Sequence, residues 1–422
     1  MRVWLLHPAE PVPTDGDVRL FRYGALCRML SAAGHHATQW ASTFNHFTKT
    51  QRSTAPLSSE VEPGYQLELL PAREYRRHVG LARLRSQQDV ATAFTQRASQ
   101  QRRPDVIVAS LPTLELAQAA LDYGRQHDVP VIIDVRDLWP DFFLTPVPKL
   151  LRPLVRPLLS RFEHQARRIC REATALIGVS QGYLDWGLAK AGRAAGPDDR
   201  VVHHAYTCPT LTASQKAEFA AKWEPHGVTA SRKLRCCYFG TLGRSAGIGL
   251  IANAARIACE QGHPEIEFVV CGGGPREQEL QRQIQGLPNI QHLGWVNSQE
   301  IAWIMSRSDI GLAAYEAEVL QSLPNKPIEY LAGGLPVANT LPGELASLLS
   351  EYNCGATFSP QDAAGLARWL IDLGSSPDQT QQLAANAHQL YREQFDAQRV
   401  YAEFIDYLAA FAAPAPALLH AA

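Results

Sequence analysis

Short apolar runs alternate with helical stretches along most of the chain, and this alternation limits the fold more than any other feature of the sequence. Such alternation is typical of βαβ units, in which neighbouring strands are parallel. The runs are apolar at consecutive positions, as expected for strands that helices cover on both faces. We therefore predict an α/β protein with parallel sheets. The predicted strands are Val3–Leu6, Val106–Ala109, Val131–Ile133, Leu176–Val179, Val201–His203, Leu234–Phe239, Ile266–Cys271, Ile290–Leu293, Ile310–Ala314, Pro336–Ala338 and Gly355–Phe358.

The alternation breaks near the middle of the chain. With 422 residues the chain is too long for one core, and two domains of about 200 residues are expected. We predict a first domain over 1–205, a linker over 206–233 and a second domain over 234–395. A last helix at 396–411 has its apolar residues at helical spacing and is expected to pack back on the first domain. Residues 412–422 are expected to be a disordered tail.

Charge is divided unevenly between the two halves, although the formal net charge is −1. Residues 1–205 hold 26 Lys and Arg against 20 Asp and Glu, a net of +6, and residues 206–422 hold 14 against 21, a net of −7. This asymmetry indicates that the halves meet different partners. The proportions of hydrophobic (46%) and charged (19%) residues argue against disorder and fibrous structure.

The eight cysteines show no C-x-x-C pair and no regular spacing. We expect reduced, buried thiols in a cytosolic protein, and neither a disulfide framework nor a zinc site. The run Val3–Leu6 is short and is followed by His7 and Pro8, which predicts a first strand and not a signal peptide. No run approaches the roughly 18 apolar residues that span a bilayer, so any membrane contact is expected to be peripheral.

Glycine-rich turns follow predicted strands of the second half, at the edge where open α/β sheets bind ligands. The turn within 238–247 contains Gly243 and leads into a helix, so its backbone can approach a phosphate, and Arg244 adds a cation. The alternative is a plain turn with a solvated arginine. The turn within 268–275 disfavours NAD, because Glu277 occupies the third glycine position of G-x-G-x-x-G.

A third turn ends at Gly294. It predicts either a main-chain site for a nucleobase or a packed turn with Trp295 in the core.

The segment 321–337 carries the strongest signal. Its prolines predict the start of a short helix, and its glycine pair predicts the end of that helix. Lys326 at the helix start can meet a phosphate. Glu329 lies one turn further, in a mostly apolar helix, where the two hydroxyls of a ribose would satisfy its oxygens. A glutamate paired with a neighbouring arginine is the alternative.

Here the chain resembles a family, the retaining family 4 glycosyltransferases of the GT-B fold that build bacterial surface polysaccharides. The resemblance implies two Rossmann-like parallel-sheet domains that face each other across a cleft. Glu329 matches the second glutamate of the family's E-x7-E motif, which holds the donor ribose. Gln321 stands at the first position, so the sugar contact of that position changes. Arg244 and Lys326 match the cations set against the donor diphosphate, and Asn325 and Gly294 complete the implied donor site.

The first half adds similar cues. Gly16, in Pro13-Thr14-Asp15-Gly16, resembles the family's first loop near the donor phosphates, and 34–38 resembles its turn into the second strand. The segments 42–49 and 134–140 resemble a subgroup that extends lipid-linked oligosaccharides. They make His46 and Asp137 candidates for contacting the acceptor or the transferred sugar. The alternatives are a structural role for His46 and a helix-capping role for Asp137.

The resemblance implies a UDP-sugar donor and a lipid-linked saccharide acceptor, with no metal and no cofactor. The catalytic candidates are Arg244, Lys326, Glu329, Asp137 and His46. Retaining enzymes of this kind work by positioning and by neutralising the leaving diphosphate. Rival interpretations are a sugar-nucleotide epimerase of the same architecture and a catalytically silent partner in a polysaccharide assembly complex.

A basic amphipathic segment at 148–171 has seven cations against one acid, Glu163, beside several leucines. A second basic stretch runs from Arg73 to Arg103 with eight arginines. These segments predict either contact with an anionic membrane surface or solvated helix faces. A cytoplasmic enzyme, peripheral at the inner face of the cell membrane, is therefore expected. Nucleic acid is disfavoured as a partner, because the basic stretches lack interleaved aromatic residues.

Overall fold

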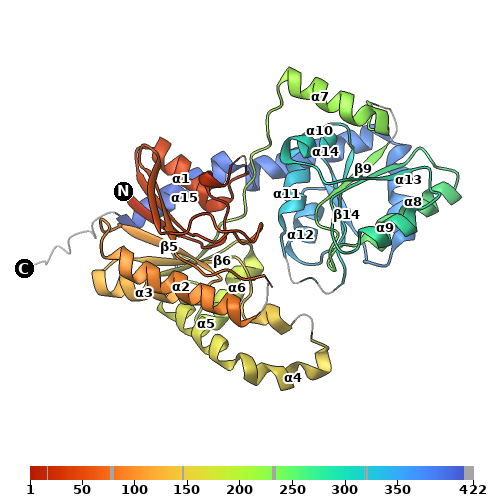
Figure 1. Cartoon of the computed structure of the whole chain (residues 1–422). Coiled ribbons are helices and arrows are strands. Elements are labelled where there is room, and N and C mark those ends of the chain that lie inside the picture. The colour runs from red at the N-terminus through yellow and green to blue at the C-terminus, as the bar shows by residue number, and fades with distance from the viewer. Residues whose placement is uncertain are drawn as a thin grey trace, which may run out of the picture. The chain divides into compact units, whose positions relative to one another are not determined.

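The computed structural model describes residues 1–16, 18–76, 80–144, 147–230, 234–317, 319 and 322–412. They form two compact units. The first unit contains Met1–His203 and the segment that begins at Val400, and the second unit contains His204–Arg399. Each unit is built around one largely parallel sheet with helices on both faces (Figure 1), which confirms the predicted α/β class.

The sheet of the first unit has eight strands in the order β3-β4-β2-β1-β5-β6-β7-β8. All neighbouring strands are parallel except the pair β3 and β4, which is antiparallel. The strands are β1 (Arg2–Leu6), β2 (His36–Ser42), β3 (Leu57–Glu62), β4 (Tyr65–Leu70), β5 (Val106–Leu111), β6 (Val131–Val135), β7 (Ala175–Gly178) and β8 (Arg200–Val201).

The hairpin of β3 and β4 at one edge of this sheet was not predicted from the sequence, and it corrects the expectation of purely parallel strands. Strand β3 is largely exposed and reads Leu-Ser-Ser-Glu-Val-Glu, and β4 carries Gln66 and Glu68 among its apolar residues. Neither has the consecutive apolar positions of a strand covered on both faces. The two strands are joined at Gly64, whose φ of 83° lies in the region that favours glycine.

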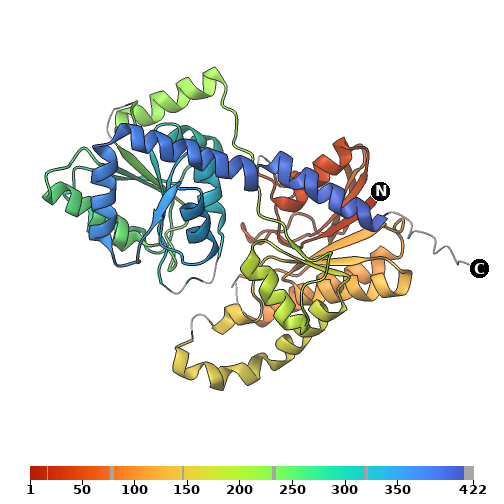
Figure 2. The same cartoon turned by 180° about the vertical axis from the view of Figure 1, so that it is seen from behind.

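Helices cover both faces of the first sheet (Figures 1 and 2). The side chains of α2, α3, α5 and α6 share one core cluster with Trp4 and Trp40, whose ring centroids lie 5.1 Å apart. The opposite face carries α1 and α15, and the Arg22 guanidinium of α1 lies 5.6 Å from the Phe404 ring centroid of α15. The helices are α1 (Arg22–Ala32), α2 (Leu81–Ala98), α3 (Leu114–His127), α4 (Arg152–Val155), α5 (Ser160–Glu172), α6 (Gln181–Ala191) and α15 (Ala397–Ala412).

The last helix, α15, is anchored within the first unit. Phe404 and Leu408 are buried, and the Tyr407 hydroxyl donates to the Asp198 carbonyl over 2.9 Å. These apolar positions are those that the sequence placed on one helical face. The predicted tail was 412–422; Ala412 is the last residue of α15, and residues 413–422 lie outside the described residues.

The sheet of the second unit has six parallel strands in the order β11-β10-β9-β12-β13-β14. They are β9 (Arg235–Phe239), β10 (Glu267–Cys271), β11 (Ile290–Gly294), β12 (Ile310–Ala313), β13 (Val337–Asn339) and β14 (Gly355–Thr357). Each lies within one residue of its predicted bounds. The signal was strong for the inner strands β9, β10, β12 and β13 because these strands are almost entirely buried.

One face of the second sheet carries α8, α9 and α13, and the other carries α10, α11, α12 and α14 (Figure 1). The segment 206–233, expected as a linker, contributes Phe219, Trp223 and Val228 to the core of this unit, and its residues 231–233 lie outside the described residues. The helices are α7 (Ala213–Trp223), α8 (Ile248–Glu260), α9 (Glu277–Ile284), α10 (Ser298–Met305), α11 (Asn325–Ala332), α12 (Glu344–Glu351), α13 (Ala363–Gly374) and α14 (Pro377–Gln394).

All eight cysteines are free thiols, and six of them are buried. In the part of the chain that the structure describes, no helix combines the length and the apolar character that crossing a membrane requires.

Helix α11 is docked on the second sheet by Tyr330. The Tyr330 ring lies directly over Gly311 of β12, where a Cβ atom would come within 2.2 Å of the Tyr330 Cγ atom. The Tyr330 hydroxyl accepts from the Phe239 N–H (3.1 Å) and donates to the Leu312 carbonyl (3.3 Å). A glycine at position 311 is therefore required for this contact.

We expect Gly311→Ala to lower the free energy of unfolding of the second unit by about 1–3 kcal/mol, because the added methyl group overpacks a buried contact. Urea unfolding would measure the change. Gly249→Ala is the matched control, since a Cβ atom on Gly249 in α8 meets nothing within 4 Å, and alanine there should be neutral or slightly stabilising. Equal stability of the two variants would contradict the docking role of Tyr330.

Candidate functional site

Two glycine-rich turns are joined through their backbones. The first turn follows the carboxyl end of β9, and the second turn follows the carboxyl end of β10. The Gly240 N–H donates to the Cys271 carbonyl and the Leu242 N–H donates to the Gly273 carbonyl, each over 3.0 Å. The Gly272 N–H donates to the carbonyl of Gly294 at the end of β11 (2.6 Å). All three predicted turns therefore meet at one edge of the second sheet.

Glycine is required where these turns touch. Gly272 has a φ of 129°, and a Cβ atom there would lie 1.9 Å from the Gly240 carbonyl oxygen. Gly274 has a φ of 152°, and a Cβ atom there would lie 2.8 Å from the Leu242 carbonyl oxygen. The glycines of 272–274 thus allow close packing of one turn on the other, and this packing leaves the first turn as the surface that faces α11.

The Lys326 side chain of α11 crosses the backbone of the first turn. A Cβ atom on Gly240 would lie 2.3 Å from Lys326 Cε. Lys326 Nζ donates to the Tyr238 hydroxyl (2.8 Å) and lies 4.3 Å from the centroid of the Tyr238 ring. Burial lowers the pKa of Lys326 to about 8, although the charge of Glu329 acts in the opposite direction. The turn and the helix therefore hold an ammonium group at a partly desolvated position.

Helix α11 has the bounds that its sequence predicts. It follows Pro324 and ends at Gly333, after which Gly334 takes a φ of 70°. Glu329 lies one turn after Lys326 and is half-buried. After burial, the charge of Glu329 is the second cause that raises the pKa of the Cys208 thiol, so these two residues lie close together.

The remaining predicted donor residues are distributed around this edge. Gly243 is half-buried in the first turn, and Arg244 beside it is exposed. Asn325, the first residue of α11, is also exposed. Gln321 lies outside the described residues. The structure thus brings Lys326 and Glu329 together beside the first turn, and it leaves the Arg244 side chain in solvent.

The turn that ends β11 is not packed with Trp295 in the core, which was one of its two predicted alternatives. Trp295 has an exposed fraction of 75% and is not part of the core. Gly294 has a φ of 73°, and the neighbouring His292 supports the turns by a hydrogen bond between its Nε2 atom and the Gly272 carbonyl (2.6 Å). The main chain and an exposed indole are available at this position.

Arg276 was missed by the sequence analysis, and it fixes the end of the first turn. Its Nη1 atom donates to the Ala246 carbonyl (2.7 Å) and to Glu316 (2.9 Å), and its other side-chain nitrogens pair with Glu279. The Glu316 N–H in turn donates to the Ser245 carbonyl (3.0 Å). Glu279 is a local partner, but the local sequence around Arg276 does not indicate Glu316, which follows β12, or Ala246 of the first turn.

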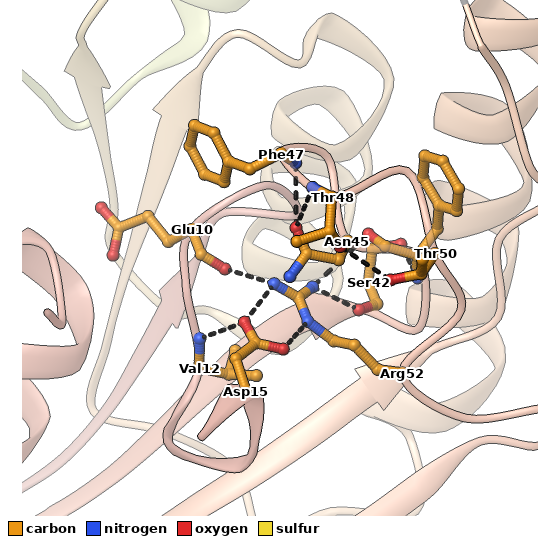
Figure 3. Close-up of polar contacts among 10 residues, drawn as sticks. Glu10, Val12, Asp15, Ser42, Asn45, Phe47, Thr48, Thr50 and Arg52 are labelled. Atoms are coloured by element: carbon orange, nitrogen blue, oxygen red, sulfur yellow. Dashed lines mark hydrogen bonds and ion pairs between the residues drawn. The ribbon is translucent and has the colours of Figure 1, made fainter. Parts of the chain in front are cut away.

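Arg52, which was also missed, holds the loop that carries Gly16 in the first unit (Figure 3). Its Nε and Nη2 atoms donate to both carboxylate oxygens of Asp15 (2.7 and 2.8 Å). The same guanidinium donates to the carbonyls of Ser42 and Glu10 (2.8 and 2.9 Å). The pair is almost completely buried, with exposed fractions of 4% for Arg52 and 6% for Asp15.

The pKa of Asp15 lies below its ordinary value. Burial acts against ionisation, but the hydrogen bonds from Arg52 and from the Val12 N–H outweigh it. The loop of Gly16 is thereby tied to the loop after β2, so Gly16 has a fixed position at the carboxyl edge of the first sheet.

His46 and Asp137 lie after β2 and β6, at the same edge of the first sheet. His46 Nδ1 is hydrogen bonded to the Tyr75 hydroxyl (2.6 Å), and its ring lies edge-on to Phe47. Asp137 accepts from the Leu138 N–H (2.9 Å), and burial raises its pKa. No helix begins at this position, since the next helical turn starts at Asp141, so Asp137 is not a helix cap.

A buried polar network, also missed, supports this edge from below. The Glu10 carboxylate pairs with Arg136 and accepts from the Tyr23 N–H (2.9 Å). The Tyr23 hydroxyl donates to Asp134 (3.1 Å), whose other oxygen lies 3.5 Å from Arg22. The negative charges of two acids are therefore balanced by the positive charges of two arginines inside the first unit.

Two family models match the chain. The model described as glycosyl transferase 4-like domain matches residues 22–207, and the model described as glycosyl transferases group 1 matches residues 233–376.

Two curated proteins of Arabidopsis thaliana are similar in sequence. The sulfoquinovosyl transferase SQD2 is 23% identical over 270 residues, which are 62% of this chain and 48% of that protein. The UDP-glycosyltransferase TURAN is 25% identical over 113 residues, 26% of this chain and 24% of that protein. The chain thus matches about half or less of the length of these relatives.

Solved structures share the fold over nearly the whole chain. Sucrose-phosphate synthase from Thermosynechococcus elongatus superposes with a TM-score of 0.73 at 16% identity, over 98% of this chain and 100% of that chain. Anabaena HepE in complex with UDP gives a TM-score of 0.68 at 16% identity, over 97% and 99%. At this identity the likeness concerns the fold, and it confirms the GT-B class expected from the sequence.

We expect one lysine of the protein to titrate near pH 8 and to be identified as Lys326, because its burial disfavours the charged form. Exposed lysines titrate above about pH 10. NMR of 13C-methylated lysines would measure the midpoint, and Lys326→Arg should remove that signal. Inorganic pyrophosphate should raise the midpoint, since an anion favours the ammonium form. A Lys326 signal that titrates with the exposed lysines would refute this prediction.

Proposed function

Both halves of the chain belong to glycosyltransferase domain families, and from this premise we propose that the protein is a retaining enzyme that moves a hexosyl or N-acetylaminosugar residue from a UDP-sugar to a lipid-linked saccharide. The proposed place of action is the cytoplasmic face of the cell membrane, in surface polysaccharide biosynthesis. The resemblance in the sequence and the geometry of the second unit support this assignment.

The observation that carries the proposal is the position of Lys326. Its ammonium group lies over the Gly240 backbone at the carboxyl edge of the sheet, with a pKa lowered to about 8 by burial. A diphosphate at this edge would restore the charged form and supply the counter-charge. Arg244 is exposed at the other end of the same turn and is free to swing toward the same diphosphate as a second cation.

We base the other proposed donor contacts on the resemblance in the sequence. We assign the ribose hydroxyls to Glu329, the base to the main chain at Gly294, and the phosphates to Gly243, Asn325 and the loop of Gly16. Gln321 would meet the transferred sugar with an amide where the family motif has a carboxylate. The complexes of HepE with UDP and with UDP-glucose support uridine as the nucleotide.

The proposed reaction needs no protein nucleophile. The bond between the anomeric carbon and the diphosphate oxygen breaks while Arg244 and Lys326 neutralise the leaving group. The acceptor oxygen bonds to the anomeric carbon on the same face, and its proton passes to the departing phosphate oxygen. Glu329 holds the ribose, and His46 and Asp137 position the acceptor or the sugar. The two cations would thus serve in place of a metal ion.

An exposed leucine patch supports the membrane location. The patch is Leu150, Leu151, Leu154 and Leu158, with exposed fractions between 49% and 92%. It lies on a helical stretch through α4 that projects from the sheet of the first unit (Figure 2), and the exposed Arg156 and Arg161 flank it. Apolar side chains next to cations suit the surface of an anionic leaflet.

Two other functions are weighed against transfer. An epimerase of the same architecture would act on the donor without an acceptor, and a silent partner in an assembly complex would not turn over at all. Lys326 on the first turn and the exposed Arg244 favour transfer, because two cations there would stabilise a departing diphosphate. The names of structural neighbours, among them sucrose-phosphate synthase, favour a group transfer as well.

We expect Glu329→Gln to weaken UDP binding by about 10- to 100-fold, because a charged hydrogen-bond acceptor for the ribose is lost. Calorimetry would measure binding. Mass spectrometry of incubations with nucleotide sugars and polyprenyl-diphosphate saccharides would measure transfer.

Glu351→Gln, which changes an exposed glutamate at the end of α12, is the control and should bind UDP normally. A donor converted without acceptor would replace transfer by epimerisation, and unchanged UDP binding by Glu329→Gln would remove the ribose assignment.

We also expect the triple variant Leu150→Gln, Leu154→Gln and Leu158→Gln to lose binding to anionic liposomes at low salt. Burial of one leucine contributes about 1.5–3 kcal/mol, so the loss of three should be complete in a sedimentation assay. Trp295→Gln changes an equally exposed apolar residue of the second unit and should bind as the unchanged protein does. Liposome binding that survives the triple variant would disprove the role of the leucine patch.

A further inference from the structure

Lys49, after β2, has a strained backbone. Its φ of 60° lies in the left-handed region, which costs a residue with a side chain about 1 kcal/mol. Asn45 imposes this conformation, since its side-chain oxygen accepts from the N–H groups of Phe47 (2.9 Å) and Thr48 (3.2 Å) and its carbonyl accepts from the Lys49 N–H (3.0 Å). Strain that neighbours enforce is typical of residues with a function.

The ammonium group of Lys49 is held without a hydrogen-bond acceptor. Its Nζ atom is buried, and no partner for it exists among the residues that the structure describes. It lies 4.8 Å from the centroid of the Tyr75 ring. An aromatic face attracts a cation but does not replace the hydrogen bonds of water. The ammonium group of Lys49 is therefore a charged hydrogen-bond donor whose hydrogen bonds are not satisfied.

A second cation, the guanidinium group of Arg83 in α2, lies near the ammonium group of Lys49. Its guanidinium lies 4.8 Å from the centroid of the Trp139 ring. After burial, the charge of Arg83 is the next cause that lowers the pKa of Lys49, so the two cations are near enough to repel each other. Burial also lowers the pKa of Arg83, with Tyr75 and Asp137 acting in the opposite direction.

Tyr75 and Asp137 are the polar residues that act on these cations. Tyr75 binds His46 through its hydroxyl, and Asp137 is the carboxylate that acts on Arg83. Lys49 and Arg83 thus bring two positive charges to a place beside the rings of Tyr75 and Trp139. An anion with several oxygens would accept from both cations and remove their repulsion.

We propose that Lys49 and Arg83, resting on Tyr75 and Trp139, form an anion-binding subsite that takes a phosphoryl or carboxylate group of the acceptor. This rests on the proposed transfer reaction and makes the acceptor an anion. The subsite lies after β2 and β6, between His46 and Asp137, which are the candidate residues of the first unit for contacting the acceptor or the sugar. It would therefore position the acceptor beside them. The same chemistry serves a lipid diphosphate, a sugar phosphate or an acidic sugar.

The test measures binding of inorganic pyrophosphate to the full chain by calorimetry, with UDP present in excess to occupy the donor site. We expect one additional pyrophosphate to bind, Lys49→Met to weaken it by about tenfold or more, and Lys49→Arg to retain most of the affinity. Lys49→Met should unfold at the same or a higher temperature, since it removes an uncompensated buried charge. Lys216→Met, an exposed lysine of α7, is the control and should bind as the unchanged protein does.

Equal affinity of Lys49→Met and the unchanged protein would overturn the subsite. Parallel titrations separate its sources: binding of pyrophosphate but not of glucuronate assigns a phosphoryl acceptor, and binding of glucuronate assigns an acidic sugar. The absence of both would also overturn the proposal. UDP alone should bind equally to Lys49→Met and the unchanged protein. Failure of UDP to bind at all would overturn the donor site of the proposed function and leave a pyrophosphate site at Lys49 standing.

Discussion

The candidate site of the second unit depends on one contact, the passage of the Lys326 side chain over the backbone of Gly240. Any side chain at position 240 would occupy the space of Lys326 Cε. The turn can come this close only because Gly272 and Gly274 let the next turn pack against it from below, and α11 is held in register by Tyr330 on Gly311. Glycines on three strands thus serve one purpose, the placement of an ammonium group at the sheet edge.

The sequence predicted the parts of the fold whose signal is local. The inner strands of both sheets are almost entirely buried, and the predicted apolar runs of the second sheet and of the central strands of the first lie within one or two residues of the observed bounds at most ends. The hairpin of β3 and β4 escaped because an edge strand keeps polar residues on its open face. The segment 206–233 was interpreted as a linker because Phe219 and Trp223 are isolated among charged residues, although both are buried.

The site was predicted to the extent that it follows from short motifs. Glycine turns, Lys326 and Glu329 are neighbours in sequence or lie at the ends of predicted strands, so their convergence follows from the topology. Arg52 and Arg276 were missed because each holds loops that are far apart in the chain, such as Asp15 and Ser42 for Arg52. An arginine that bridges loops has no local signature. The exposure of Trp295 was equally hidden, since a lone tryptophan after a strand fits a core and a surface alike.

The groups that each cation contacts show whether the cation supports the structure or is a candidate for binding a ligand. Arg52, Arg136 and Arg276 are bound by carboxylates and carbonyls, so their charge is cancelled and their donors are occupied. Lys49 and Lys326 rest on the rings of Tyr75 and Tyr238. An aromatic face stabilises a cation by about 0.5–2 kcal/mol and leaves its charge in place. Burial lowers the pKa of both lysines, so the charged form of each is disfavoured until an anion arrives and stabilises it. Each unit thus carries one ammonium group on a tyrosine at the carboxyl edge of its sheet, the arrangement required to grip an anion.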